Sequence, residues 1–135
     1  MGSRRKSRES CLQMLYDWEC SKGSVDAISM RFWKENEEDV DTKEFANFLF
    51  FGTIEHQQEV DHLLETYSSN WKVSRMGNID RNLLRASAFE LLYRKDIPVS
   101  VTIDEAVEIA KKFGTEESAG FVNGILDRIA KEKRS

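Results

Sequence analysis

The segment 79–93, IDRNLLRASAFELLY, is the strongest constraint on the fold, because its apolar residues cover almost the whole circumference of a helix. At 100° per residue, one stripe holds Leu84, Ala88, Leu91 and Leu92, while Leu83, Ala86 and Phe89 fall outside it. A helix that is apolar all round is buried among other elements. We therefore expect this segment at the centre of the fold, with other helices around or beside it.

The rest of the chain also repeats its apolar residues at helical spacing, and we predict an all-α fold of about seven helices with no sheet. One Pro and seven Gly in 135 residues leave little room for hairpins. The length suggests a single domain over 1–135. Within it we expect an N-terminal helical half over about 1–70 and a C-terminal helical half over about 71–135.

Capping residues predict where these helices begin. The first helix is expected over 3–20 and the second over 25–34, capped by Ser24. A long third stretch begins near residue 43, breaks near Gly52 or Glu59 and ends at 68–70, and the central helix follows at 79–93. The remaining expected caps are Asp41 or Thr42 for the third helix, Ser100 or Thr102 for the helix that ends at Gly114, and Thr115 for the last helix, which runs to about Lys131.

The sequence carries none of the common catalytic or phosphate-binding motifs, so we expect a binding protein and not an enzyme. His56 and His62 are six residues apart, on different faces of a helix, and they do not predict a metal site. No cofactor is expected. Cys11 and Cys20 lack a CxxC spacing and are interpreted as reduced thiols of a cytoplasmic protein. No apolar run approaches the length of a membrane span, and no secretory signal is recognised.

The charge is unevenly distributed along the chain, although the net charge is only −4. Residues 4–9, RRKSRE, carry four positive charges and one negative, whereas residues 35–41, ENEEDVD, carry five negative charges. Cations at the start of a helix oppose the helix dipole and give the helix itself no stability. The basic start of the first helix is therefore either a solvated, frayed terminus or a surface that contacts phosphate groups.

The stretch 120–127, GFVNGILD, places two glycines inside a predicted helix, where each costs about 0.5–1 kcal/mol relative to alanine. The helical wheel puts Gly120 and Gly124 roughly opposite the apolar stripe and Phe121 at its edge. One interpretation is close packing against another helix, with Phe121 at the edge of the core. The other is an open surface where a partner approaches the backbone and a nucleic-acid base stacks on Phe121.

Three segments in this order and spacing resemble the family of the bacterial transcription antitermination factor NusB. They are RRKSRESCLQMLYDWE at 4–19, IDRNLLRASAFELLYRKDIP at 79–98 and VTIDEAVEIAKKFGTEESAGFVNGILDRI at 101–129. The third segment is the most specific, and the region 21–70 matches mainly by pattern. A similar domain occurs fused to RNA cytosine methyltransferases. A chain that ends at Ser135 has no room for a catalytic domain, which favours the stand-alone factor.

The resemblance implies two packed helical bundles and binding to single-stranded boxA RNA of nascent ribosomal RNA transcripts. It also implies a partner, the small-subunit ribosomal protein NusE, in a transcription antitermination complex with RNA polymerase. The positions that match the RNA-binding residues of the family are Arg4, Arg5, Lys6, Arg8, Glu117 and Phe121, and those that match its protein-binding residues are Tyr16 and Asp80. The sequence departs from the family pattern at Gly120, where a larger polar residue is expected, and the acidic Glu117 would have to accept a hydrogen bond from a base.

Several expectations about function remain open at this point. Asp80 either compensates the dipole of its own helix or faces a basic partner. An acidic chain with one modest basic patch should bind RNA weakly alone, so we expect NusE to make the binding cooperative. The alternatives are an RNA-binding module that assists an RNA modification enzyme in trans and a helical scaffold that binds only proteins. A monomer and a homodimer are both compatible with the sequence.

Overall fold

The computed structural model describes residues 3–69 and 71–134, and within these ranges the chain forms seven α-helices, one 3-10 turn and no strand. The elements are α1 (Arg4–Ser21), α2 (Val25–Glu35), α3 (Val40–Glu55), α4 (Gln57–Tyr67), η1 (Val73–Arg75), α5 (Asn78–Tyr93), α6 (Val99–Phe113) and α7 (Ser118–Lys133). The all-α prediction is confirmed. Among the described helices, none has both the length and the apolar character needed to cross a membrane.

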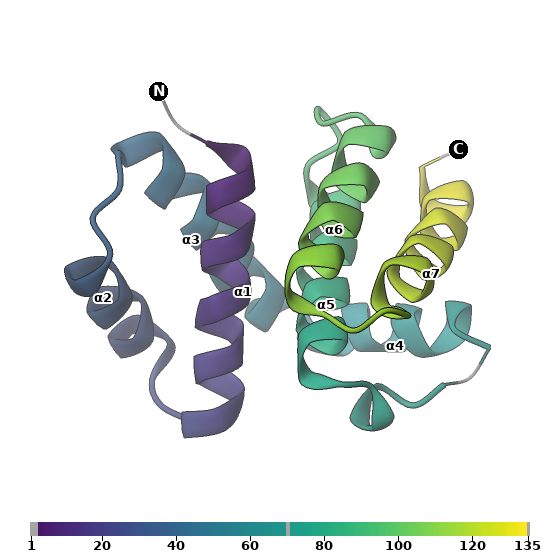
Figure 1. The fold of residues 1–135 in the computed structure, drawn as a ribbon, viewed down its shortest axis with the longest axis horizontal. Helices are drawn as coiled ribbons and strands as arrows, with labels where there is room; N and C mark the ends of the chain where they lie inside the picture. The colour runs from purple at the N-terminus through teal and green to yellow at the C-terminus, as the bar shows by residue number, and fades with distance from the viewer. Residues whose placement is uncertain (1–2, 70, 135) are drawn as a thin grey trace.

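The helices form two groups that meet at α1 and α5. Helices α1, α2 and α3 make one group, and α4 to α7 make the other (Figure 1). Helix α5 contacts α1, α3, α4, α6 and α7, and α4 packs on α5 and α7. Helix α4 therefore lies with the C-terminal helices, although the sequence division near residue 70 would group it with the N-terminal ones.

Helix α5 is the central helix, as its apolar pattern predicts. Every residue from Asn82 to Leu91 is buried, polar ones included. Helix α3 approaches it closely at Gly52, whose bare Cα faces the ring of Phe89. The buried side chains of Asn82, Arg85 and Glu90 on α5 form hydrogen bonds with side chains of α1, α4 and α6, which orients those helices.

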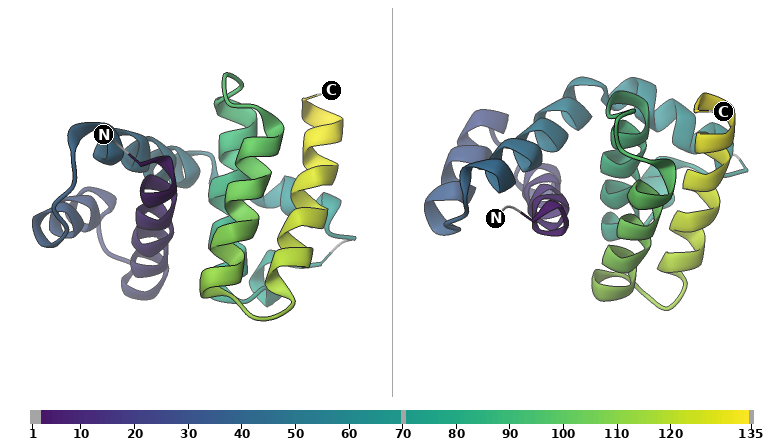
Figure 2. Two further views of the ribbon diagram at one scale, coloured as in Figure 1. Left: turned by 45° about the horizontal axis from the view of Figure 1, so that its top comes forward. Right: turned by 90° about the horizontal axis from the view of Figure 1, so that it is seen from above.

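Two clusters of ionic hydrogen bonds attach α1 to α5. Near the start of α1, Arg8 pairs with Glu90, and near its end Glu19 pairs with Arg81 and Arg85. Figure 2 shows from two further sides that α1 lies between α2 and the α5–α6 pair, while α3 passes across α1 and reaches α5. The clusters hold α1 at both ends, so the side chains of its first turn have a fixed place relative to the C-terminal helices.

Some predicted helix starts are confirmed and others are wrong. Ser24 caps α2 as predicted, because its Oγ accepts a hydrogen bond from the backbone N of Ala27 at 3.3 Å. The cap of α3 is Asp39 and not Asp41 or Thr42, so the helix begins at Val40, inside the acidic run 35–41. The long third stretch does break, at His56, between the two predicted positions.

The last two helices also differ from prediction at their starts. Helix α6 begins at Val99, directly after Pro98, so neither Ser100 nor Thr102 caps it. The Thr102 hydroxyl is instead buried and donates to Glu90. Helix α7 begins at Ser118, three residues after the predicted cap Thr115, whose Oγ1 accepts from the backbone N of Glu117 in the preceding turn.

Candidate nucleic-acid interface

The first turn of α1 is a formed helical turn that carries exposed cations. The Oγ of Ser3 caps it by accepting from the backbone N of Lys6 at 3.1 Å. The backbone N of Ser3 donates to Oγ1 of Thr42 at 3.1 Å, which attaches this turn to the start of α3. Arg4, Arg5 and Lys6 are all exposed. The start of α1 is therefore a fixed basic surface and not a frayed end.

Arg5 and Lys6 each have an acidic neighbour, but both side chains remain accessible to an incoming phosphate. The guanidinium of Arg5 donates to both carboxylate oxygens of Glu105 on α6, at 2.5 and 2.8 Å. This hydrogen bond raises the pKa of Arg5 and lowers the pKa of Glu105. The Nζ of Lys6 lies 3.9 Å from a carboxylate oxygen of Glu38. Because the side chains of Arg5 and Lys6 remain 44% and 51% exposed, an incoming phosphate can reach both.

The expectation that Arg8 belongs to an exposed basic surface is corrected by its burial. The side chain of Arg8 is 7% exposed, and its Nε and Nη2 donate to the two carboxylate oxygens of Glu90 at 2.9 and 2.7 Å. Arg8 continues the buried stripe of α1, so it faces α5, whereas Arg4, Arg5 and Lys6 in the first turn are exposed. Its guanidinium is enclosed, and it positions α1 on α5.

The start of α7 brings two aromatic residues together. The partly buried ring of Phe121 packs on the core and meets the ring of Trp71 edge-on, with 6.3 Å between the ring centroids. Trp71 is 52% exposed. Glu117 is exposed just before the first turn and makes no side-chain cap there. The sequence does not predict this contact, because Trp71 and Phe121 lie far apart in the chain.

The two glycines of α7 face open space. A Cβ built on Gly120 or Gly124 would have no heavy atom within 4 Å in the part of the chain that the structure describes. Neither glycine has a positive φ that would favour glycine over other residues. Packing against a neighbouring helix of this chain therefore does not explain them, and the interpretation as an open surface is the one that the structure supports.

Replacing Gly124 with alanine is expected to raise the free energy of unfolding by about 0.5–1 kcal/mol, because alanine loses less backbone entropy in a helix and meets no neighbour. Urea unfolding followed by circular dichroism measures this change. Asn123→Ala, at the exposed neighbouring position of the same helix, controls for the general effect of alanine. A loss of stability in Gly124→Ala would contradict the open surface.

The residues expected to bind RNA do not form one compact site. The first turn of α1 lies near the top of Figure 1 and the first turn of α7 lies lower, next to the end of α6, with α6 between the two helices. An RNA that touches both Arg5 and Phe121 must therefore run along the α1–α6–α7 side of the molecule. This arrangement suits an extended single strand.

Tyr16 and Asp80, which are expected to bind the protein partner, lie on α1 and α5, and Glu19 connects these two helices by hydrogen bonds. Tyr16 on α1 is 47% exposed, and Asp80 is half-buried in the first turn of α5. One turn after Tyr16, Glu19 accepts hydrogen bonds from Asn78 and Arg81 of α5, at 2.9 Å from Asn78 Nδ2. Glu19 is not predictable from the sequence as part of this surface, because nothing in its local sequence distinguishes it from a solvated acid.

Within residues 3–69 and 71–134, no group of three His, Cys, Asp or Glu side chains is arranged to hold a metal ion. Both cysteines are free thiols. Burial raises the pKa of the Cys11 thiol, and Cys20 is exposed on the last turn of α1.

Comparison with known proteins assigns the family. The NusB family model matches residues 5–131. Transcription antitermination protein NusB of Thermodesulfovibrio yellowstonii is 50% identical over 96% of this chain and 93% of its own length. The protein of the same name from Myxococcus xanthus is 47% identical over 96% of each chain.

Solved structures give the same assignment. NusB of T. maritima superimposes with a TM-score of 0.91 at 41% identity, covering 100% of this chain and 96% of that one. A chain in the complex of antitermination factors NusB and NusE with double-stranded RNA superimposes with a TM-score of 0.87 at 27% identity, over 96% of each chain. On its sequence and on its fold, the chain belongs to the NusB family.

Proposed function

We propose that this chain is a transcription antitermination factor that binds boxA RNA of nascent ribosomal RNA transcripts together with NusE, in the bacterial cytoplasm. Family membership along nearly the whole chain carries this proposal, because the relatives are transcription antitermination proteins and not enzymes. The structural support is the exposed basic turn at the start of α1, whose cations oppose the dipole of their own helix.

In this proposal, Arg4, Arg5 and Lys6 bind the RNA backbone. The buried Arg8 does not contact RNA and holds α1 on α5 through Glu90. Arginine and lysine neutralise phosphates and release condensed counterions, so this part of the affinity depends on salt. Arg5 already holds Glu105, and a phosphate would share or replace that carboxylate. The RNA contact set is therefore smaller than the four cations that the sequence suggests.

Replacing Arg4, Arg5 and Lys6 with alanine is expected to weaken boxA binding and to reduce the slope of log K against log salt by up to about 2, or roughly 0.7 for each lost phosphate contact. Fluorescence anisotropy at several salt concentrations gives the slope. A matched variant changes Arg31, Lys34 and Lys133 to alanine, which removes the same charge from exposed positions away from the proposed RNA contacts. If both variants keep the wild-type slope, the start of α1 does not contact RNA.

A base of the same RNA stacks on the aromatic pair at the start of α7, and Glu117 accepts a hydrogen bond from a base amino group. Phe121 and Trp71 meet edge-on, so together they present flat apolar faces at an angle. Stacking on such faces tolerates any base. The exposed backbone at Gly120 lets the strand pass close to the helix.

Phe121→Ala is expected to cost about 1–3 kcal/mol in RNA binding if a base stacks there. Because Phe121 also packs on the core, the same variant must be tested for stability by thermal unfolding. Trp71→Ala is the comparison, since Trp71 is more exposed and contributes less to the core. Lower stability with unchanged RNA affinity in both variants would show that the pair is only structural.

NusE docks across α1 and α5 in this proposal, at Tyr16 and Asp80. Glu19 ties the two helices together between these residues, so the spacing of the docking surface is fixed before the partner arrives. Asp80 supplies negative charge to a basic ribosomal protein. A basic partner at this surface extends the positive surface available to RNA, which is the physical reason for cooperative binding.

A further inference from the structure

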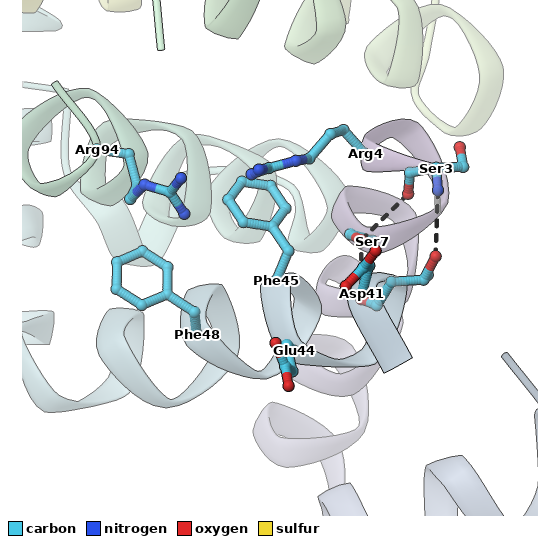
Figure 3. Close-up of a pocket in the computed structure, with 9 residues that line it drawn as sticks. Ser3, Arg4, Ser7, Asp41, Glu44, Phe45, Phe48 and Arg94 are labelled. Carbon is cyan, nitrogen blue, oxygen red and sulfur yellow. Dashed lines mark hydrogen bonds between the residues drawn. The ribbon is translucent and has the colours of Figure 1, made fainter. Parts of the chain in front are cut away.

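A pocket of about 540 Å³ lies where the start of α1, the start of α3 and the end of α5 meet (Figure 3). Its volume is within the usual range for sites that hold small molecules. The lining residues used below are Arg4, Asp41, Glu44, Phe45, Phe48 and Arg94. Of these residues, only Arg4 matches an RNA-binding position of the family.

Two guanidinium groups share one aromatic ring in this pocket. The guanidinium carbon of Arg4 lies 4.0 Å from the ring centroid of Phe45, and that of Arg94 lies 5.1 Å from it. Figure 3 shows the two groups reaching toward each other across this ring. Arg94 also donates to Asp96 at 2.9 and 2.8 Å, which lowers the pKa of Asp96 to about 2. The charge of Arg4 also lowers the pKa of Asp96, so this carboxylate already lies near both cations, and an incoming phosphate would share or replace it.

An open aromatic face lies beside these cations. Phe48 is 38% exposed, and the guanidinium carbon of Arg94 lies 5.4 Å from its ring centroid. The carboxylates of Asp41 and Glu44 are on the side away from Arg94 (Figure 3). A phosphate therefore fits only the arginine side of the pocket. The carboxylates can accept hydrogen bonds from a base amino group.

We propose that this pocket binds one nucleotide of the RNA, with its phosphate between Arg4 and Arg94 and its base on the ring of Phe48. The inference rests on the proposed function and extends the RNA path from Arg5 and Lys6 past the start of α1 to the α5–α6 turn. Flat side chains that stack on bases and paired arginines that hold a phosphate are the usual components of single-strand recognition.

The walls of the pocket are fixed without a ligand. The backbone N of Ser3 donates to Oγ1 of Thr42, and Oγ of Ser7 donates to the backbone O of Thr42 at 2.8 Å. These bonds join α1 to α3 on one side of the pocket. Binding therefore orders few side chains, and little of the interaction energy is lost.

The test uses the full chain with boxA RNA and, separately, with cytidine 5′-monophosphate. Phe48→Leu is expected to weaken RNA binding about 5- to 100-fold through lost stacking. Arg94→Gln is expected to reduce the salt slope by about 0.7. The matched control is Arg31→Gln, which removes another arginine paired to a surface carboxylate, on α2. Thermal unfolding checks that Phe48→Leu remains folded, and Arg94→Gln tests the pocket without changing the core.

Cytidine monophosphate is expected to shift the ring-proton resonances of Phe45 and Phe48 in the wild type, and to shift them less in Arg94→Gln. If wild-type protein binds boxA RNA and both variants bind it equally well, the pocket proposal is overturned and the proposed function stands. If the mononucleotide shifts these resonances but boxA RNA does not bind, the pocket stands and the proposed function fails. Loss of NusE binding in Arg94→Gln, with RNA binding unchanged, would overturn the pocket in favour of a protein contact.

Discussion

Replacing Glu90 with alanine is expected to lower the free energy of unfolding by about 3–5 kcal/mol, the usual cost of leaving one member of a buried ion pair without its partner. Glu90 is 1% exposed and accepts hydrogen bonds from Arg8 and Thr102. Without it, the guanidinium of Arg8 stays enclosed, with Glu105 at 3.7 Å as its remaining carboxylate. Urea unfolding followed by circular dichroism gives the free energy.

Two control variants show whether the loss of stability comes from leaving a buried charge without its partner. Glu108→Ala removes a carboxylate from an exposed pair with Lys111 and should cost less than about 1 kcal/mol. The double variant Arg8→Met with Glu90→Leu removes both charges and should recover most of the loss, because apolar side chains can fill the site. If Glu90→Ala costs no more than Glu108→Ala, the pair does not hold α1 on α5.

Replacing Gly52 with alanine is expected to destabilise the protein by about 1–3 kcal/mol, because the added methyl group overpacks the contact between α3 and α5. A Cβ at this position would lie 2.5 and 2.8 Å from two ring atoms of Phe89 and closer still to Cζ. The Phe89 ring is 3% exposed and stacks on Tyr93, so it cannot turn away freely. The helix propensity gained from alanine offsets only part of this cost.

The opposite sign is expected for the same substitution at Gly124, which makes that variant the matched control. A second check is Phe89→Leu, which should make room for the methyl group. In the double variant, Gly52→Ala should cost less than it does alone. If Gly52→Ala costs the same in the Phe89→Leu background as in the wild type, the added methyl group does not clash with Phe89.

How α1 is held explains why its first turn can act as a binding surface. The pair of Arg8 with Glu90 fixes one end of the helix and the cluster around Glu19 fixes the other. The exposed cations project from a helix that cannot rotate on α5. Destabilising either cluster should therefore weaken RNA binding indirectly, and comparisons between variants need a stability measurement beside each affinity.

The sequence predicts the fold class and the central helix well because burial follows local periodicity. The all-round apolar pattern at 79–93 corresponds to the buried stretch of α5, and Ser24 caps α2 as its position suggests. Helix starts are harder to predict when several capping residues adjoin. Thr102 illustrates the reason, because its hydroxyl bonds to Glu90 on another helix instead of capping its own.

The candidate site is only partly predictable from the sequence, because its contacts also join residues that are far apart in the chain. The helical wheel of α1 shows that Arg8 continues the buried stripe, but its partner Glu90 is 82 residues away in the chain, and nothing local connects them. The contact of Trp71 with Phe121 and the shared ring between Arg4 and Arg94 are also tertiary. The sequence therefore identifies the basic turn, and the fold decides which of its cations face solvent.

The most direct test of the proposed function is an anisotropy titration of labelled boxA RNA with the chain alone, with NusE alone and with both, at one salt concentration. A scrambled RNA and a boxA duplex serve as specificity controls. The double variant Tyr16→Ala with Asp80→Ala should bind RNA alone like the wild type and lose the gain from NusE. We predict weak binding by the chain alone, at least tenfold tighter binding with NusE present (about 1.4 kcal/mol), and preference for boxA over the scrambled strand. Equal affinity with and without NusE, or equal affinity for the scrambled strand, would contradict the account.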